Sequence, residues 1–386
     1  MGRLEQYLLI GLLVMVGLAV FVIVVMPRLD SGALAPDQPM AMGETETMPA
    51  RVLEVLEEGV VELGEGISQP YQRLLLHIEG GSLKGQEIEV EEGTINLITQ
   101  DRLFHPGDRI YVQRAIGPNS DRVYVSDFIR TAPLIWIGGL FVMLVVLVGR
   151  GRGARALAGT VVSLAVVFAF ILPQIKAGGD PVWVSVVGSI GLLAVSTHLI
   201  YGWNLKAHAA VIGMMLSLSL TGALAWLFVG WTRLTGMGME ESAYLVMELG
   251  ADLNFRGLVL GGIIIGSLGV LDDVCVGQAS AVFELVNANR DLSWRELFRR
   301  SLNIGRDHIA AMVNTLLLAY AGASMPLLLV FTIYQEPIWQ RINREPIAEE
   351  IVRTLVGSVG LVLAVPITGL VASLLARWAV RKDERE

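Results

Sequence analysis

Two adjacent aspartates, Asp272 and Asp273, lie near the middle of the apolar run 257–283. A carboxylate deep in a bilayer costs several kcal/mol, so acids in such runs face protein or a wet cavity. At helical spacing, Asp273 continues a stripe of small residues: Gly262, Gly266, Gly269, Gly277 and Ser280. Because glycines let a neighbouring helix approach closely, this stripe predicts that Asp273 faces a tight helix–helix seam, with Asp272 at its edge.

The following apolar run, 309–333, offers a matching polar face. We expect Asn314 and Thr315 to lie deep in the membrane, opposite the two aspartates. Nearer the cytoplasmic entry of the same helix we expect three charged or titratable residues, Arg306, Asp307 and His308. An unpaired carboxyl beside amide and hydroxyl groups can carry a proton, because desolvation disfavours its charged form.

The same residues admit two other interpretations. In the first, the small residues only pack helices, and one acid caps a helix break or pairs with Arg306. In the second, Asp273 and Asp307 form an intramembrane hydrolase, although no Gly-x-Gly-Asp run is present. The sequence has no P-loop, no HExxH motif and no cluster of Cys and His ligands, so we expect no enzyme activity, cofactor or metal.

The elements that position these residues are long apolar blocks. Hydrophobic residues make up 53% of the 386-residue chain and charged residues 17%, which is typical of a polytopic α-helical membrane protein. Residues 1–29 contain an apolar block that we expect to be an uncleaved membrane anchor, and 30–48 read as a linker. The region 132–386 holds seven more blocks, which predict about eight spanning helices in all: 133–149, 157–175, 182–201, 207–231, 257–283, 309–333 and 352–376.

The region 49–131 has a different pattern and predicts a small β-rich domain between the first two helices. Turn residues separate five short candidate strands: 51–55, 74–78, 87–90, 109–112 and 122–125. Five strands in a region of this size suit a small OB-like barrel. The region is acidic and has no aromatic and basic stripe, so nucleic acid is not an expected partner.

The distribution of basic residues predicts the orientation in the bilayer. With the N-terminus in the cytoplasm, the cytoplasmic segments hold 14 Lys and Arg, whereas the short opposite loops hold 6. Positive charge concentrates on the cytoplasmic side of membrane proteins. We therefore expect both termini in the cytoplasm and residues 30–131 outside it. The one cysteine, Cys275, excludes a disulfide within the chain.

Several runs resemble the YibE/F family of bacterial multi-pass membrane proteins: residues 269–274, 278–285, 305–309 and 314–324. The resemblance implies a protein of the bacterial plasma (inner) membrane but supplies no biochemical activity. The chain is more distantly similar to one half of the RND exporters and of SecD and SecF. That likeness implies that Asp272 and Asp273 are proton sites, that Asn314 and Thr315 face them, and that a second half comes from another chain.

These observations predict a proton-coupled secondary transporter or export accessory. We expect a homodimer, or a complex with a related membrane subunit, that acts on a small molecule, ion or protein cargo. The alternative is a non-transporting membrane scaffold or assembly factor, in which the acids only pair helices.

Overall fold

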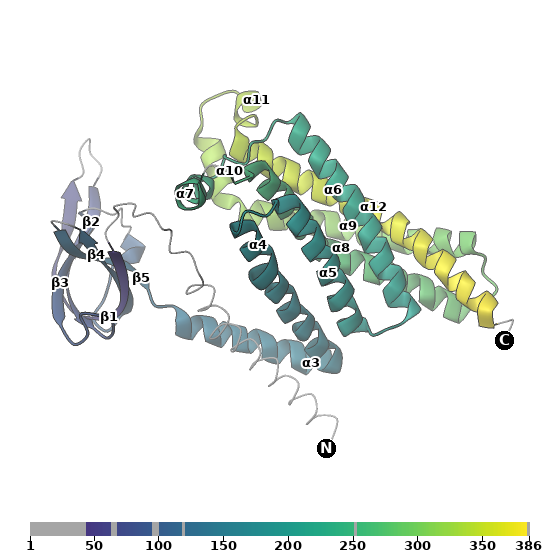
Figure 1. The fold of residues 1–386 in the computed structure, drawn as a ribbon, viewed down its shortest axis with the longest axis horizontal. Helices are drawn as coiled ribbons and strands as arrows, with labels where there is room; N and C mark the ends of the chain where they lie inside the picture. The colour runs from purple at the N-terminus through teal and green to yellow at the C-terminus, as the bar shows by residue number, and fades with distance from the viewer. Residues whose placement is uncertain (1–43, 63–67, 95–99, 118–119, 251–252, 384–386) are drawn as a thin grey trace, which may run out of the picture. The chain divides into compact units, whose positions relative to one another are not determined.

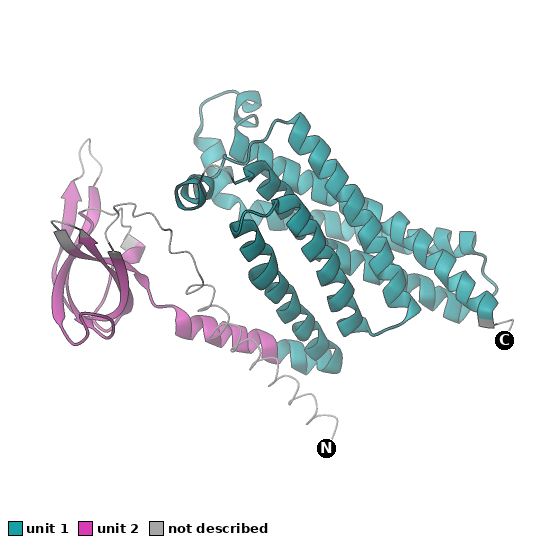
Figure 2. Ribbon diagram, in the orientation of Figure 1, with its two compact units in different colours: residues 1–30, 144–386 teal, residues 31–143 magenta. Residues whose placement is uncertain are grey.

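The structure is a computed structural model that describes residues 44–62, 68–94, 100–117, 120–250 and 253–383 (Figure 1). The predicted anchor in residues 1–29 and most of the predicted linker lie outside the described residues. The chain divides into two compact units, one of residues Ser31–Met143 and one of residues Met1–Asp30 with Leu144–Glu386 (Figure 2). Each unit is described by itself below.

The first unit contains a small antiparallel sheet, with strands in the order β3-β2-β1-β4-β5. Each of the five predicted strands is present, and each is longer than predicted. Their bounds are β1 (Glu44–Glu62), β2 (Ser68–Ile78), β3 (Glu87–Glu92), β4 (Arg109–Gly117) and β5 (Ser120–Phe128).

The core of the sheet follows the alternation of its strands. Every second side chain is buried from Met48 to Val52 on β1 and from Gln72 to Ile78 on β2. Phe104, which precedes β4, fills the same core. The 19-residue β1 pairs with β4 through its first half and with β2 from Ala50 onward. The pairing of β1 with β2 shifts register at two bulges in β1. Each bulge adds an extra residue, which locally increases the twist of the strand.

The sheet is open, which differs from the closed OB-like barrel that we predicted. Its two edge strands, β3 and β5, share no ladder of backbone hydrogen bonds. A side chain connects them instead: the backbone amide of Val125 on β5 donates to Glu92 Oε1 on β3 at 3.0 Å. Elsewhere in the core, Gln72 of β2 links to the segment before β4, since its side-chain amide both donates to and accepts from the backbone of Phe104.

The second unit is helical. After α3 (Thr131–Val166) the chain continues through a π-helical turn (Val167–Ile171) into α4 (Leu172–Lys176). The remaining helices are α5 (Pro181–Tyr201), α6 (Leu205–Trp231), α7 (Glu240–Leu249), α8 (Phe255–Ala288), α9 (Trp294–Ala323), α10 (Met325–Ile333), α11 (Ile338–Arg341) and α12 (Glu345–Asp383).

Five helical segments among the described residues are long and apolar enough to cross a membrane. A sixth is added if α9 and α10, which are bent by 69° at their junction, form one span. The predicted blocks 133–149 and 157–175 fall in one segment, Thr131–Lys176, with a break at Arg150, whose φ is 50°. The structure therefore supports a polytopic helical membrane protein. The predicted count of eight spans is not confirmed, because the described residues give five or six.

Three helices, α6, α8 and α12, pack against one another at the centre of this unit. Two glycines allow the backbones of α6 and α12 to approach each other closely. A Cβ atom on Gly213 would collide with Thr368, and one on Gly360 would collide with Thr221. Because lipid provides no hydrophobic drive between helices, such close backbone packing is what holds them together.

The starts of α5 and α8 are held side by side. Asp180 caps α5 by accepting from the backbone amides of Val182 and Trp183. Asn254 caps α8 through Gly257 and also donates to Asp180 Oδ2 at 3.2 Å. The two helices therefore begin at the same level and run in the same direction.

The buried carboxyl that bridges the edges of the sheet makes the stability of this domain depend on pH. Burial raises the pKa of Glu92, and the Val125 amide and Arg102 oppose this shift only in part. A carboxyl whose pKa is higher in the folded state binds its proton more tightly there, so its contribution to stability falls as pH rises through that pKa.

We expect the Glu92→Gln substitution to stabilise the sheet at neutral pH and to have little effect in acid, where Glu92 is already protonated. Glutamine keeps the oxygen that accepts from Val125 but has no charge to bury. The gain should be on the order of 1 kcal/mol, or about fivefold slower amide exchange on β5, measured by hydrogen exchange on the full-length protein. Exposed Glu91→Gln serves as the control. Faster exchange in Glu92→Gln at neutral pH would contradict this assignment.

Candidate functional site

The aspartate pair lies in the middle of α8, as residues 18 and 19 of its 34. At 1.5 Å per residue, the pair is about 25 Å from the start of the helix. Because α5 begins at the same level, its last residue, Tyr201, lies near both carboxylates and interacts with them electrostatically. Asp272 is half-buried, and its Oδ1 is buried without a hydrogen-bond partner. Among the described residues, neither Asp272 nor Asp273 has a salt bridge to a cation.

The glycine stripe of α8 does not form the seam that we predicted. Gly262, Gly269 and Gly277 have no other side chain or backbone of the described residues within 4 Å of a Cβ position. Only Gly266 approaches α9, where Tyr320 Oη lies 3.4 Å from that position. Asp273 lies on this same exposed face, next to half-buried Ser280. Asp272 is therefore the more enclosed of the two acids, which reverses our expectation.

The polar residues predicted on α9 are not assembled around the aspartates. Asn314 and Thr315 are both exposed, and the Thr315 hydroxyl donates to the Ala311 carbonyl of its own helix. The three residues nearer the start of α9 are exposed too, and Arg306 donates to Asn303. Within the described residues, no hydrogen bond or ion pair joins Arg306, Asp307, His308, Asn314 or Thr315 to either aspartate.

An aromatic cluster of three rings occupies the turn between α5 and α6, just beyond Tyr201. The ring of His198 packs 4.3 Å from Trp203 and 5.0 Å from His208, measured between ring centroids. The Nδ1 atom of His198 is 2.7 Å from the Ala194 carbonyl, while its Nε2 atom is buried without a partner. His198, His208 and Tyr201 therefore lie at the same end of α5, and Tyr201 is the one of them that lies near the aspartates.

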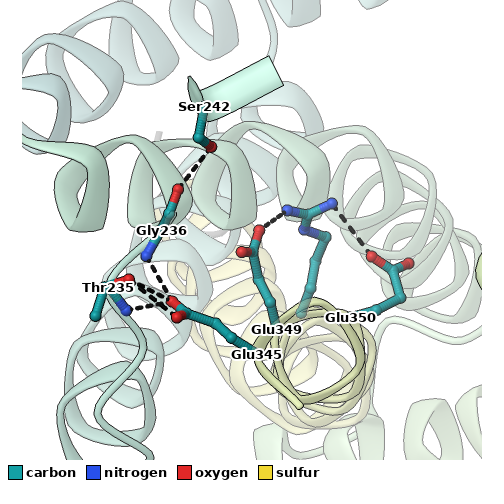
Figure 3. Close-up of polar contacts among 7 residues, drawn as sticks. Thr235, Gly236, Ser242, Glu345, Glu349 and Glu350 are labelled. Atoms are coloured by element: carbon teal, nitrogen blue, oxygen red, sulfur yellow. Dashed lines mark hydrogen bonds and ion pairs between the residues drawn. The ribbon is translucent and has the colours of Figure 1, made fainter. Parts of the chain in front are cut away.

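A second polar cluster lies at the start of α12 (Figure 3). The Glu345 carboxylate accepts hydrogen bonds from the backbone amides of Thr235 and Gly236 and from the Thr235 hydroxyl. Ser242 of α7 donates to the Gly236 carbonyl at 2.7 Å. Gly236 has a φ of 80°, and a Cβ there would collide with the backbone of Phe255. One carboxylate therefore ties the loop between α6 and α7 to α12.

Two turns later, Arg353 lies near two glutamates of the same helix. Its guanidinium is 2.5 Å from Glu349 and 3.3 Å from Glu350. The Glu349 residue is only 2% exposed, and Arg353 Nε is buried without a partner. Two carboxyl groups therefore share one guanidinium.

Metal binding has no support in the described part of the chain. No group of three or more His, Cys, Asp or Glu side chains there is placed to hold a metal ion. Cys275 is a free, buried thiol that lies beside Ser217 and Thr368 in the centre of the bundle.

The model of the YibE/F-like protein family matches residues 137–378. The chain belongs to this family. Neither a curated protein nor a solved structure matches it.

The family match places both polar clusters in the part of the chain that YibE/F-like proteins have in common. It begins near the start of α3 and ends near the end of α12, so it includes the aspartate pair and the cluster around Arg353. The β-sheet lies before it. The match supports membership and membrane character, and it assigns no activity to either cluster.

Sequence reasoning missed the cluster at the start of α12. Its signal was present in Glu349-Glu350-x-x-Arg353, because residues three and four apart lie on one face of a helix. Arg353 is one of the six basic residues that we assigned to the short loops opposite the cytoplasm. Burial of Glu349 could not be read from this spacing, since it depends on the surrounding helices.

Replacing Arg353 by methionine should destabilise the protein by about 3–5 kcal/mol, because it leaves the buried Glu349 charge without a partner. The double variant Glu349→Gln/Arg353→Met should recover part of that loss. Thermal unfolding of the purified protein in detergent measures both.

The control is Arg299→Met, since Arg299 is 75% exposed and its pair with Glu296 is long at 3.9 Å. This control should unfold within about 0.5 kcal/mol of the parent. A double variant that is no more stable than Arg353→Met alone would show that the ion pair does not carry the effect.

Proposed function

We propose that this protein is a proton-coupled secondary transporter or export accessory of the bacterial plasma membrane, with Asp272 and Asp273 as its proton sites. The proposal includes the orientation inferred from the basic residues, with both termini in the cytoplasm and residues 30–131 outside it. The observation that carries it is the carboxylate pair in the middle of α8, which has no counter-ion among the described residues.

An uncompensated carboxylate in this position is expensive for a purely structural role. Acids that only hold helices together gain that energy from a cation or a hydrogen-bond donor. The Glu349–Arg353 pair follows this pattern, whereas Asp272 Oδ1 is buried without any donor. Gain and loss of a proton would switch the Asp272 side chain between a charged and a neutral group, and the packing of α8 against its neighbours would respond.

The turn between α5 and α6 provides a candidate route for the proton. Tyr201 lies near both aspartates, and His198 and His208 follow at the same end of α5. Histidine exchanges protons near neutral pH, and a phenol can pass one on. In the proposed orientation this turn faces the cytoplasm, so the proton would exchange with that side.

The exposed glycine face of α8 supports the part of the proposal that concerns partners. Asp273 lies on that face together with Gly262, Gly269 and Gly277. Acyl chains cannot solvate a carboxylate, so a protein surface should cover it. A second copy of the chain, or a related membrane subunit, would do so, as the distant likeness to half of an RND exporter implies.

Two finer features of the architecture also belong to this proposal. A break at Arg150 would let the segment Thr131–Lys176 cross the bilayer twice. With the bent α9–α10 pair as one span, and with the anchor in residues 1–29, this would give eight spans. The strand order also suits an OB-like sheet whose last pairing, between β3 and β5, is replaced by Glu92.

The competing proposal is a non-transporting scaffold or assembly factor. In that case the aspartates would only pair helices, and their replacement would reduce protein abundance. Abundance and activity therefore have to be measured on the same preparations.

We expect Asp272→Asn to insert at parental abundance and to lower proton flux at least tenfold in proteoliposomes, as reported by an enclosed pH-sensitive dye under an imposed membrane potential. Asparagine preserves the shape of the aspartate side chain but cannot gain or lose a proton near neutral pH. Asp273→Asn should lower the flux as well. Asp291→Asn, at the exposed turn after α8, is the matched control and should behave like the parent.

Parental flux in Asp272→Asn would exclude Asp272 as a proton site. A loss of abundance that accounts for the whole loss of flux would favour the scaffold. If the proton flux of the parent is no greater than that of protein-free vesicles, the proposal of a transporter is refuted.

A further inference from the structure

The bend between α9 and α10 opens a groove against α12. Pro326 is in the first turn of α10, and the two helices meet at 69°. The groove encloses about 320 Å³, which is near the lower end of the range for small-molecule sites, roughly 300–1,000 Å³. It is lined by side chains of α9, α10 and α12 that are almost entirely apolar, among them Leu328, Phe331, Ile351 and Leu355.

The connection that follows α10 holds this groove in shape. Arg341 donates to the Phe331 carbonyl at 2.9 Å and lies over its ring, with 4.8 Å between the guanidinium carbon and the ring centroid. Arg344 pairs with Glu336 at 2.7 Å and lies over the Tyr334 ring. The hydrogen bond from Arg344 holds the pKa of Glu336 below its ordinary value. Charged contacts thus anchor the end of α10 and the connection that follows it.

One charged side chain, Glu350, lines the groove. Its pairing with Arg353 is the weaker of two: the guanidinium lies 2.5 Å from buried Glu349 and 3.3 Å from Glu350 (Figure 3). Arg353 does not line the groove itself. Glu350 is therefore the carboxylate of the cluster that faces the groove.

An aromatic ring stands opposite this carboxylate. Tyr320 of α9 lines the same groove and interacts electrostatically with Glu350 and Arg353. Apolar walls, a ring face and one carboxylate together suit an organic cation whose charge is spread over an apolar body. An anion would meet repulsion, and a small hydrated cation would gain nothing from the apolar walls.

We propose that the groove between α9, α10 and α12 binds a hydrophobic monovalent cation, with Glu350 as its counter-ion. Binding requires neither proton coupling nor the aspartate pair, so this proposal stands apart from the proposed function.

The test uses the full-length purified protein and two probes of nearly equal shape and opposite charge, the tetraphenylphosphonium cation and the tetraphenylborate anion. Equilibrium dialysis in detergent micelles, with the partition into protein-free micelles subtracted, gives the affinity for each. The parent should bind the cation at least tenfold more tightly than the anion. Glu350→Gln should reduce cation affinity at least tenfold and leave the anion unchanged or slightly better bound.

Two further variants separate the site from general effects of substitution. Leu328→Trp fills the groove and should reduce cation binding while Glu350 remains. Glu241→Gln removes an exposed carboxylate on α7 and should leave binding at the parental value. Circular dichroism and size-exclusion profiles that match the parent ensure that each variant is folded.

Equal affinity for the two probes, or parental cation affinity in either Glu350→Gln or Leu328→Trp, would overturn the proposal. A zwitterionic lipid that stays bound to the groove against excess cation would also overturn it, because lipid would then be the occupant.

Discussion

Close backbone contact between α6, α8 and α12 is the constraint on which the rest of the helical unit depends. Gly213 and Gly360 receive the threonines of the facing helix, and Gly369 of α12 receives Gln278 of α8. Hydroxyls in this centre donate within their own helix, as Ser217 does to the Gly213 carbonyl and Ser373 to the Gly369 carbonyl. The core is therefore tight and polar. Some of its donors, such as the Thr368 hydroxyl and the Gln278 side-chain amide nitrogen, have no partner, and Asp272 Oδ1 has none either among the described residues.

The two acidic clusters differ in the partners that surround a buried carboxylate. At the start of α12, Glu349 has a guanidinium within hydrogen-bonding distance, and Glu345 has two backbone amides and a hydroxyl. In the middle of α8, the part of the bundle that the structure describes supplies no such partner to Asp272 Oδ1. The first arrangement fixes elements to one another, because removing either member leaves an unpaired charge. The second leaves a carboxyl whose charge can change without breaking a bond, as a carrier of protons requires.

Much of the architecture could be predicted from the sequence, because it depends on local patterns. Short runs of alternating side chains predicted all five strands, and long apolar blocks predicted helices α5, α6, α8 and α12. The direction of a helix face could not be predicted in this way. Gly269 and Gly277 do form one stripe, but the close packing of α6 against α12 uses Gly213 and Gly360 of those two helices. Helix α8 contributes Gln278 and Cys275 to the centre. Periodicity defines which residues share a face, whereas the choice of neighbour is a property of the whole bundle.

The break in α3 has a further consequence for how this helix can rearrange. Arg150 adopts a positive φ although glycines precede and follow it in the run Gly149-Arg150-Gly151-Arg152-Gly153. Such a conformation costs a residue with a side chain about 1–3 kcal/mol, while glycine adopts it freely. A shift of the break by one residue in either direction would therefore relieve strain instead of adding it. The position of the break along the chain can therefore shift. Each shift by one residue moves a residue from one helical piece to the other and would rotate it by about 100° around the helix axis.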